Sequence, residues 1–346
     1  MKSYLKMALA VTIAMWFCPD KADACTRVLY HSDSTGVTVT GRTLDWVQDI
    51  PTNLYLMPRG EKRAGYDTPD AISWTARYGS VVAVGYDMGV SEGMNEKGLV
   101  CNLLYLPGTS YTYKGDTRKK MSTSIWAQYV LDNFATVDEA ISELSKDVFY
   151  IDAPAMPDGK STTLHMAISD PSGASAIIEY VNGVLHIYSG AQYKVLTNAP
   201  TYPQQLAITD YWNGVGGLNM LPGTNRSADR FARSSFYVNA LPDNLDLRHA
   251  IAGTLSVIRN ASVPLGIGTH DHPEISSTRW RSLGDQTGMR YYFELTINPS
   301  VMWVDLGKVD FSKGTHKLIL ANNEMYAGEV NGKFVPTKPF HFFYHL

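Results

Sequence analysis

The chain has 346 residues, of which 45% are hydrophobic and 18% charged, with a net charge of −3 and a pI near 6.3. This composition is ordinary for a globular protein, and it gives no electrostatic reason to expect nucleic acid or an anionic membrane as a partner. Aromatic residues make up 11% of the chain, which is more simply explained by a dense β core than by an aromatic ligand.

The first 24 residues predict a secretory signal peptide. Two lysines precede an apolar run over residues 7–17, which is long enough for a signal-peptide core and too short to span a bilayer. Ala22-Asp23-Ala24 then places small residues at the two positions that signal peptidase reads. We therefore expect cleavage after Ala24, export to the periplasm or the medium, and a mature protein of one domain over residues 25–346. No membrane span is expected in that mature chain.

Beyond the signal, hydrophobic periodicity and turn residues predict strands, then helices, then strands. The expected strands cover residues 27–30, 37–40, 80–86, 99–106, 163–169, 174–181, 184–188, 194–197, 278–283, 290–297, 302–306 and 317–320. The expected helices cover residues 123–134, 136–144, 202–212, 227–241 and 247–259, and a capping box from Thr136 to Glu139 opens the second. The glycine-rich residues 89–98 are expected to connect two strands. This order favours an α+β fold, with helices on the outer faces of layered sheets, over a doubly wound parallel sheet.

The mature chain would keep two cysteines, Cys25 and Cys101, which is too few for a disulfide framework. They could pair with each other, although that bridge would tether a flexible terminus for little gain. Cys25 could also carry a lipid, but the residues before it lack the usual leucine three positions upstream and include a charge. The remaining interpretation is a free cysteine at the amino terminus.

Such a cysteine carries a nucleophile and a base on one residue. A thiol attacks as its thiolate, and an α-amine, which titrates near ~8, can exchange the proton at neutral pH and later give it to the leaving nitrogen of an amide. Arg42 and Asp45 lie three residues apart at the end of an expected strand, where they could support this chemistry or form a surface ion pair. Taken together, these residues favour Cys25 as a nucleophile that could act on an amide.

Several sequence blocks resemble those of the choloylglycine hydrolases, which are N-terminal nucleophile hydrolases and include bile salt hydrolases and penicillin V acylases. The blocks are Cys25-Thr26-Arg27, Gly41-Arg42-Thr43-Leu44-Asp45-Trp46, Gly93-Met94-Asn95-Glu96-Lys97-Gly98-Leu99, Thr197-Asn198-Ala199-Pro200, Leu221-Pro222-Gly223-Thr224-Asn225-Arg226 and Asp229-Arg230-Phe231. The resemblance covers nearly the whole mature chain and implies a four-layer αββα sandwich. The signal peptide makes the chain similar to the exported, Gram-negative branch.

The resemblance implies three catalytic roles near the amino terminus. Cys25 resembles the nucleophile, Arg42 the arginine beside the thiol, and Asp45 the carboxylate that holds the α-amine. Trp46, which would ordinarily be a core residue, is a candidate for lining the acyl pocket.

Three further site residues come from later in the chain. Asn198 resembles the side-chain oxyanion donor, and Tyr105 the residue whose backbone N–H completes the oxyanion hole. Arg230 resembles the second active-site arginine. Without the resemblance, Asn198 could shape a turn, Arg230 could form a structural ion pair, and Tyr105 could be part of the core.

For the substrate, the overall sequence most resembles exported bile salt hydrolases, and this resemblance favours glycine- or taurine-conjugated bile salts. Penicillin V and an N-acyl homoserine lactone are the alternatives. Tyr105 leaves this choice open, because penicillin V acylases carry an aromatic residue there and bile-salt-specific relatives in the other branch often carry Asn. A lipid-anchored binding protein is the alternative from another class.

No cofactor is expected, and no catalytic metal, because His270-Asp271-His272 and residues 341–345 lie outside the matching blocks. A homo-oligomer remains open.

Overall fold

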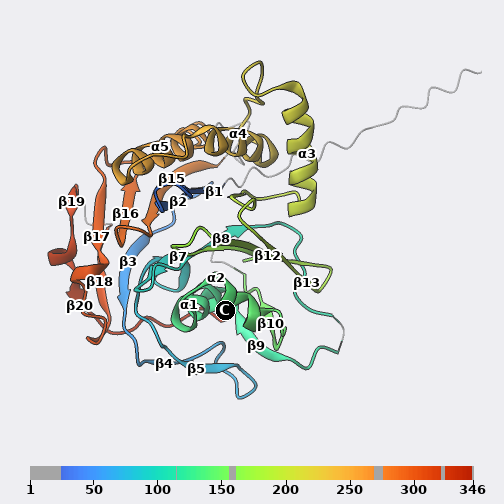
Figure 1. Ribbon diagram of the computed structural model, residues 1–346. Helices are drawn as coiled ribbons and strands as arrows, with labels where there is room; N and C mark the ends of the chain where they lie inside the picture. The colour runs from blue at the N-terminus through green and yellow to red at the C-terminus, as the bar shows by residue number, and fades with distance from the viewer. Residues whose placement is uncertain (1–24, 114, 156–160, 269–275, 321–323, 345–346) are drawn as a thin grey trace, which may run out of the picture.

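The computed structural model describes residues 25–113, 115–155, 161–268, 276–320 and 324–344. The predicted signal peptide and His270-Asp271-His272 therefore lie outside the described residues. Two large sheets are stacked face to face, with helices on both outer sides, so the layers follow the order αββα (Figure 1). The α+β sandwich expected from the order of elements is confirmed.

The first sheet holds the beginning of the described chain one strand in from an edge. Its strand order is β14-β1-β2-β15-β16-β17-β19, with every neighbouring pair antiparallel except β17 and β19. The strands are β1 (Thr26–His31), β2 (Thr38–Trp46), β14 (Val195–Leu196), β15 (Ser277–Asp285), β16 (Arg290–Leu295), β17 (Met302–Asp305) and β19 (Gly328–Glu329).

The second sheet is antiparallel throughout and has the strand order β13-β12-β11-β8-β7-β6-β3-β18-β20. Its strands are β3 (Thr52–Met57), β6 (Ser80–Gly85), β7 (Gly89–Asn95), β8 (Val100–Tyr105), β11 (Leu164–Ser169), β12 (Ser175–Val181), β13 (Val184–Ser189), β18 (His316–Leu318) and β20 (Val335–Pro336). Two small pairs lie outside it: β4 (Lys62–Ala64) with β5 (Ser73–Thr75), and β9 (Lys119–Ser122) with β10 (Phe149–Asp152).

The helices cover opposite outer faces of the two sheets (Figure 1). Helix α1 (Thr123–Asn133) packs on β7 and β8, and α2 (Val137–Leu144) packs on β12. On the far side, α4 (Ser227–Ala240) and α5 (Leu247–Asn260) pack on β1 and β2, and α3 (Tyr202–Val215) packs on α4. Two short 3-10 helices, η1 (Leu306–Lys308) and η2 (Asn331–Lys333), follow β17 and β19. Within the described residues, no helix is long and apolar enough to cross a membrane.

Burial on both faces explains the continuous apolar run of β6. Val81 and Ala83 belong to the core cluster shared with the first sheet, whereas Val82 and Val84 belong to the cluster beneath α1. Side chains of a strand alternate between its two faces, so a strand covered on both sides is apolar at consecutive positions.

Most of the elements expected from the sequence are present. Thr136 is the N-cap of α2, and its Oγ1 accepts a hydrogen bond from the Glu139 nitrogen at 3.2 Å. The reciprocal half of the expected capping box differs, because the Glu139 carboxylate accepts from the nitrogen of Ala135 at 2.8 Å rather than from that of Thr136.

The expected connection over residues 89–98 is wrong, since its first part is the strand β7. Glycine and polar residues weaken the strand signal there. In the structure, Gly93 is tightly enclosed: a Cβ at this position would lie 2.4 Å from the Val81 carbonyl oxygen.

Candidate active site

Cys25 directly precedes β1, which pairs with the short edge strand β14 and with β2 in the first sheet, and the residue is 3% exposed. Antiparallel pairing of β1 with β2 places Thr26 opposite Thr43 and Arg27 opposite Arg42. Because Arg42 and Asp45 are only three residues apart on β2, both therefore lie close to Cys25. Cys25 and Cys101 are both free, buried cysteines, so the alternative of a disulfide between them is not realised.

Strand alternation sends Arg42 and Asp45 to opposite faces of β2. Arg42 lines a pocket together with Leu44 and Trp46, the next two residues on its face. Asp45 is on the other face, where its carboxylate accepts hydrogen bonds from Thr278 Oγ1 at 2.5 Å and Thr43 Oγ1 at 3.1 Å. The sequence spacing therefore places the arginine on the pocket side of the thiol and the carboxylate behind it.

The thiol of Cys25 has two polar neighbours. Its Sγ atom lies 3.8 Å from Arg42 Nη2 and 3.9 Å from the carbonyl oxygen of Asp45. Burial raises the pKa of the Cys25 thiol above its ordinary value, and the guanidinium of Arg42 is the strongest influence in the other direction. Arg42 therefore favours the thiolate, as the sequence predicts, against a larger effect of burial.

Arg42 is itself held by a buried carboxylate that the sequence did not identify. Its Nη1 atom lies 2.8 Å from Glu92 Oε2, and both side chains are at most 2% exposed. Glu92 also accepts hydrogen bonds from Tyr291 Oη and, at 3.2 Å, from Asn102 Nδ2. This carboxylate lies on β7, the strand that was expected to be a connection. Recognition of this segment as a strand, with a single acidic residue on an enclosed face, would have identified Glu92 as a candidate site residue.

Asn198 and Arg230 meet at the backbone of Cys25. The nitrogen of Cys25 donates to Asn198 Oδ1 at 2.6 Å, and Arg230 Nη2 donates to the same oxygen at 3.0 Å. Arg230 Nη1 donates to the carbonyl oxygen of Cys25 at 2.6 Å and to Thr26 Oγ1. One buried arginine from α4 thus fixes both the cysteine and the asparagine.

Asn198 also connects the cysteine to Tyr105. Its Nδ2 atom donates to the carbonyl oxygen of Tyr105 at 2.7 Å. The ring of Tyr105 lies on the pocket wall and packs edge-on against Trp46, with ring centroids 5.6 Å apart. The structure therefore brings together all seven residues that the sequence singled out: Cys25, Arg42, Asp45, Trp46, Tyr105, Asn198 and Arg230.

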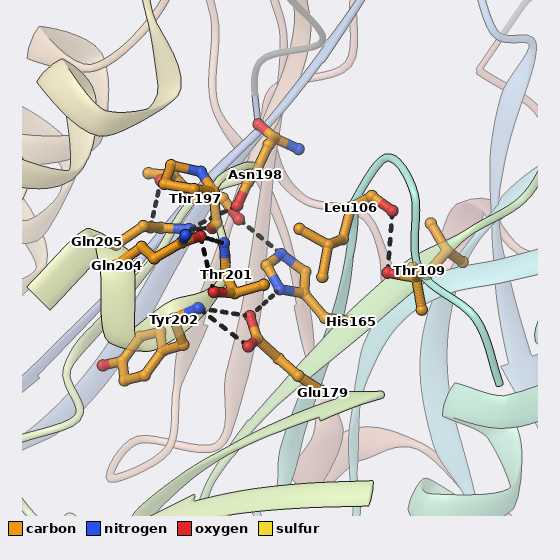
Figure 2. A network of polar contacts seen from close by, with 12 residues as sticks. Leu106, Thr109, His165, Glu179, Thr197, Asn198, Thr201, Tyr202, Gln204 and Gln205 are labelled. Atoms are coloured by element: carbon orange, nitrogen blue, oxygen red, sulfur yellow. Dashed lines mark hydrogen bonds and ion pairs between the residues drawn. The ribbon is translucent and has the colours of Figure 1, made fainter. Parts of the chain in front are cut away.

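The turn that carries Asn198 is held by a second group of residues absent from the sequence prediction (Figure 2). His165 Nε2 donates to the carbonyl oxygen of Thr197 at 2.7 Å, and His165 Nδ1 lies 2.8 Å from Glu179 Oε1. Glu179 in turn accepts from the backbone nitrogen of Tyr202, at the start of α3, at 2.9 Å. Because His165 and Glu179 are fully buried, this chain of contacts fixes the position of Asn198.

The pocket beside the thiol has a volume of about 140 Å³. Its lining is largely apolar and includes Leu44, Trp46, Met88, Leu103, Tyr105 and Phe343. A buried thiol at the wall of such a pocket suits a substrate with an apolar group next to the reacting carbonyl. Among the described residues, no group of three or more metal-ligating side chains is present.

Comparisons with known proteins agree with this arrangement. The family model described as linear amide C–N hydrolases, choloylglycine hydrolase family, matches residues 25–320. The chain is 42% identical over 345 residues to a penicillin V acylase of Pectobacterium atrosepticum, and the match covers 92% of each protein. It is 24% identical over 334 residues to a bile salt hydrolase/transferase of Clostridium perfringens, with 89% of this chain and 100% of the relative covered.

Solved structures of the same family have the same fold. The penicillin V acylase from Agrobacterium tumefaciens superimposes with a TM-score of 0.85 at 46% identity, covering 92% of this chain and 100% of that one. A variant of the conjugated bile acid hydrolase from Clostridium perfringens superimposes with a TM-score of 0.70 at 21% identity, covering 91% and 99%. The expected αββα sandwich of the N-terminal nucleophile type is therefore confirmed.

The position of Arg42 makes a prediction about thiol reactivity. Arg42→Gln should move the pH midpoint for alkylation of Cys25 by iodoacetamide to a higher value, because the guanidinium opposes the effect of burial on the thiol pKa. The rate would be followed by intact mass between about pH 6 and 10.

Arg27→Gln is the matched control for this experiment. Arg27 is a fully buried arginine on the adjacent strand, and it donates to Ser175 and to the carbonyl oxygen of Lys194 rather than to the thiol. Thermal melts would establish that both variants fold. Equal midpoints in the folded wild type and Arg42→Gln would contradict the assigned effect of Arg42.

Proposed function

The chain belongs to the choloylglycine hydrolase family of linear amide C–N hydrolases, and we propose that it uses Cys25 as an N-terminal nucleophile to cleave an amide with an apolar acyl group. The observation that carries this proposal is the convergence of Arg42, Asn198 and Arg230 on Cys25 at the wall of an apolar pocket. No cofactor is needed for this reaction, because the nucleophile and the base are both on Cys25.

The proposal includes removal of residues 1–24 and export to the periplasm of a Gram-negative bacterium. Cleavage after Ala24 would turn the nitrogen that donates to Asn198 Oδ1 into an α-amine. The intact mass of protein from its native host tests this step. A mass equal to residues 25–346 is expected, whereas added diacylglycerol on Cys25 would support the lipid-anchored alternative.

In the proposed reaction, the α-amine takes the proton of the thiol, and the thiolate forms a C–S bond to the substrate carbonyl carbon. Asn198 Nδ2 carries a second hydrogen beyond the one that it gives to Tyr105, and we assign it and the Tyr105 backbone N–H to the oxyanion. The α-ammonium then protonates the leaving nitrogen as the C–N bond breaks. Water hydrolyses the thioester, releases the acid and restores the thiol.

For the substrate, we propose a compact aromatic acyl amide of the penicillin V type ahead of conjugated bile salts. Two relatives named penicillin V acylase share 42% and 46% identity with this chain, whereas the bile salt hydrolase shares 24%. The edge-on pair of Trp46 and Tyr105 supports an aromatic acyl group, because a further ring can stack against it. This preference replaces the bile salts favoured from the sequence, which remain the second candidate.

Parallel assays of amine release test the function. The mature protein should cleave penicillin V faster than glycocholate, taurocholate or an N-acyl homoserine lactone under reducing conditions. Cys25→Ser should lower turnover of the best substrate at least ~100-fold, because a hydroxyl is a much weaker nucleophile than a thiolate. Faster cleavage of the bile salts or the lactone would overturn the substrate choice. Wild-type turnover by Cys25→Ser would overturn the nucleophile.

The buried carboxyl of Asp45 predicts a pH dependence. Burial raises its pKa from 3.8 to about 6, so the folded protein keeps this proton over a pH range in which the unfolded chain has lost it. The resulting stabilisation is complete below about pH 4 and is lost as the pH rises through 6. Hydrolysis should show the opposite trend and increase as this carboxyl ionises, because we assign the ionised carboxylate to stabilising the α-ammonium. The positive charge of that ammonium lowers the pKa of Asp45 in the mature protein, so the increase should come below about pH 6.

Asp132 is the matched control, because burial also raises its pKa to about 6 while it is bonded to Arg63 and Trp74. Asp45→Asn and Asp132→Asn should each flatten the fall in melting temperature between about pH 4 and 6. Only Asp45→Asn should remove the rise of kcat/KM with pH and lower its plateau, by about 100-fold. A rise that survives in Asp45→Asn would refute the assignment of Asp45.

A further inference from the structure

The C-terminal segment, residues 337–344, crosses the molecule to the substrate pocket. It has no regular secondary structure and reaches the start of α1. The family model matches only as far as residue 320, so this segment lies beyond the matched region. Of its residues, Phe343 is on the pocket wall, in the same cavity as Cys25.

The backbone of Phe343 is fixed from two sides. Its nitrogen donates to the carbonyl oxygen of Met88, in the turn between β6 and β7, at 2.9 Å. Its carbonyl oxygen accepts from Ser122 Oγ at 2.7 Å and from Ser124 Oγ at 2.6 Å. Ser122 is the N-cap residue of α1, so the segment is attached to the first turn of a helix that belongs to the core.

Neighbouring aromatic residues anchor the segment away from the pocket. Phe340 packs edge-on against Tyr55 at 4.9 Å between ring centroids and lies 4.7 Å from the ring of Phe342. Both phenylalanines pack on the core cluster beneath α1. Tyr344 follows, with its ring centroid 5.0 Å from that of Tyr66. Phe343, by contrast, belongs to neither core cluster and lines the pocket.

The residues that line the pocket come from separate parts of the chain. Cys25 and Arg42 belong to the first sheet, whereas Phe343 is bonded to Met88 and to the start of α1. An aromatic residue in the lining of the pocket limits the size of the group that can enter.

We propose that Phe343 is a specificity-determining residue that closes the acyl pocket against bulky acyl groups and contacts compact aromatic ones. This inference rests on the proposed hydrolysis of acyl amides and extends it to the C-terminal segment. Removal of the ring would enlarge the cavity where a fused-ring acyl group needs space. It would also remove an apolar contact to an aromatic acyl group.

The test compares Phe343→Ala with the matched control Phe342→Ala, which removes an adjacent ring of the same segment that faces the core. For each variant, kcat/KM would be measured with penicillin V and with glycocholate. Phe343→Ala should raise the ratio of glycocholate to penicillin V by about tenfold or more, and Phe343→Trp should lower it. Phe342→Ala should leave the ratio at the wild-type value. Melting temperatures would establish folding, and Phe343→Leu replaces the alanine variant if that variant does not fold.

A binding measurement separates this inference from the proposed function. The affinities for phenoxyacetate and cholate, the two product acids, would be measured by calorimetry in a Cys25→Ser background with and without Phe343→Ala. If the wild type cleaves neither substrate, the proposed function fails, and the ratio of the two affinities still reports on Phe343. An unchanged ratio in both measurements overturns the proposal. An equal change in Phe342→Ala also overturns it, because the effect would then come from docking of the segment.

Discussion

The ion pair between Arg42 and Glu92 crosses from the first sheet to the second, and the arrangement of the site depends on it. Both groups are excluded from water, and burying a charge is costly unless it is paired and hydrogen-bonded. Tyr291 comes from the first sheet and Asn102 from the second to complete the shell around Glu92. The pair therefore fixes how the sheets stack and points Arg42 at the thiol.

This arrangement explains how a buried cysteine can remain reactive. Desolvation alone would hold Cys25 as the neutral thiol, and Arg42 supplies a positive charge on the pocket side. Glu92 neutralises the other side of that guanidinium, so the site does not carry an uncompensated charge. Arg230 adds a second cation on the backbone side, where it fixes the carbonyl oxygen of Cys25 and the amide oxygen of Asn198. Reactivity is thus set by charges from three separate elements.

The sequence predicts local relationships well and distant ones poorly. Cys25, Arg42 and Asp45 could be recognised together because β1 and β2 are adjacent in sequence and pair directly. Asn198 and Arg230 could be assigned only by resemblance, since nothing local links a turn and a helix to the start of the chain. Glu92, His165 and Phe343 were missed because a buried polar residue, or an aromatic residue near a terminus, acquires its meaning only from contacts across the fold.

The residues that surround the thiol and the residues that line the rest of the pocket come from different parts of the structure. The groups that surround the thiol come from β1, β2, α4 and the turn before α3, whereas Met88, Ser124 and Phe343 bring the turn before β7, the start of α1 and the C-terminal segment to the pocket. Among the described residues, the backbone of Phe343 is bonded to Met88, Ser122 and Ser124, so its side chain can change without removing a partner of the nucleophile. Proteins that share this reaction can therefore differ in substrate, and an intact catalytic set does not by itself identify the acyl group. That identity is decided by residues such as Phe343, which lines the pocket and whose backbone is fixed by the fold.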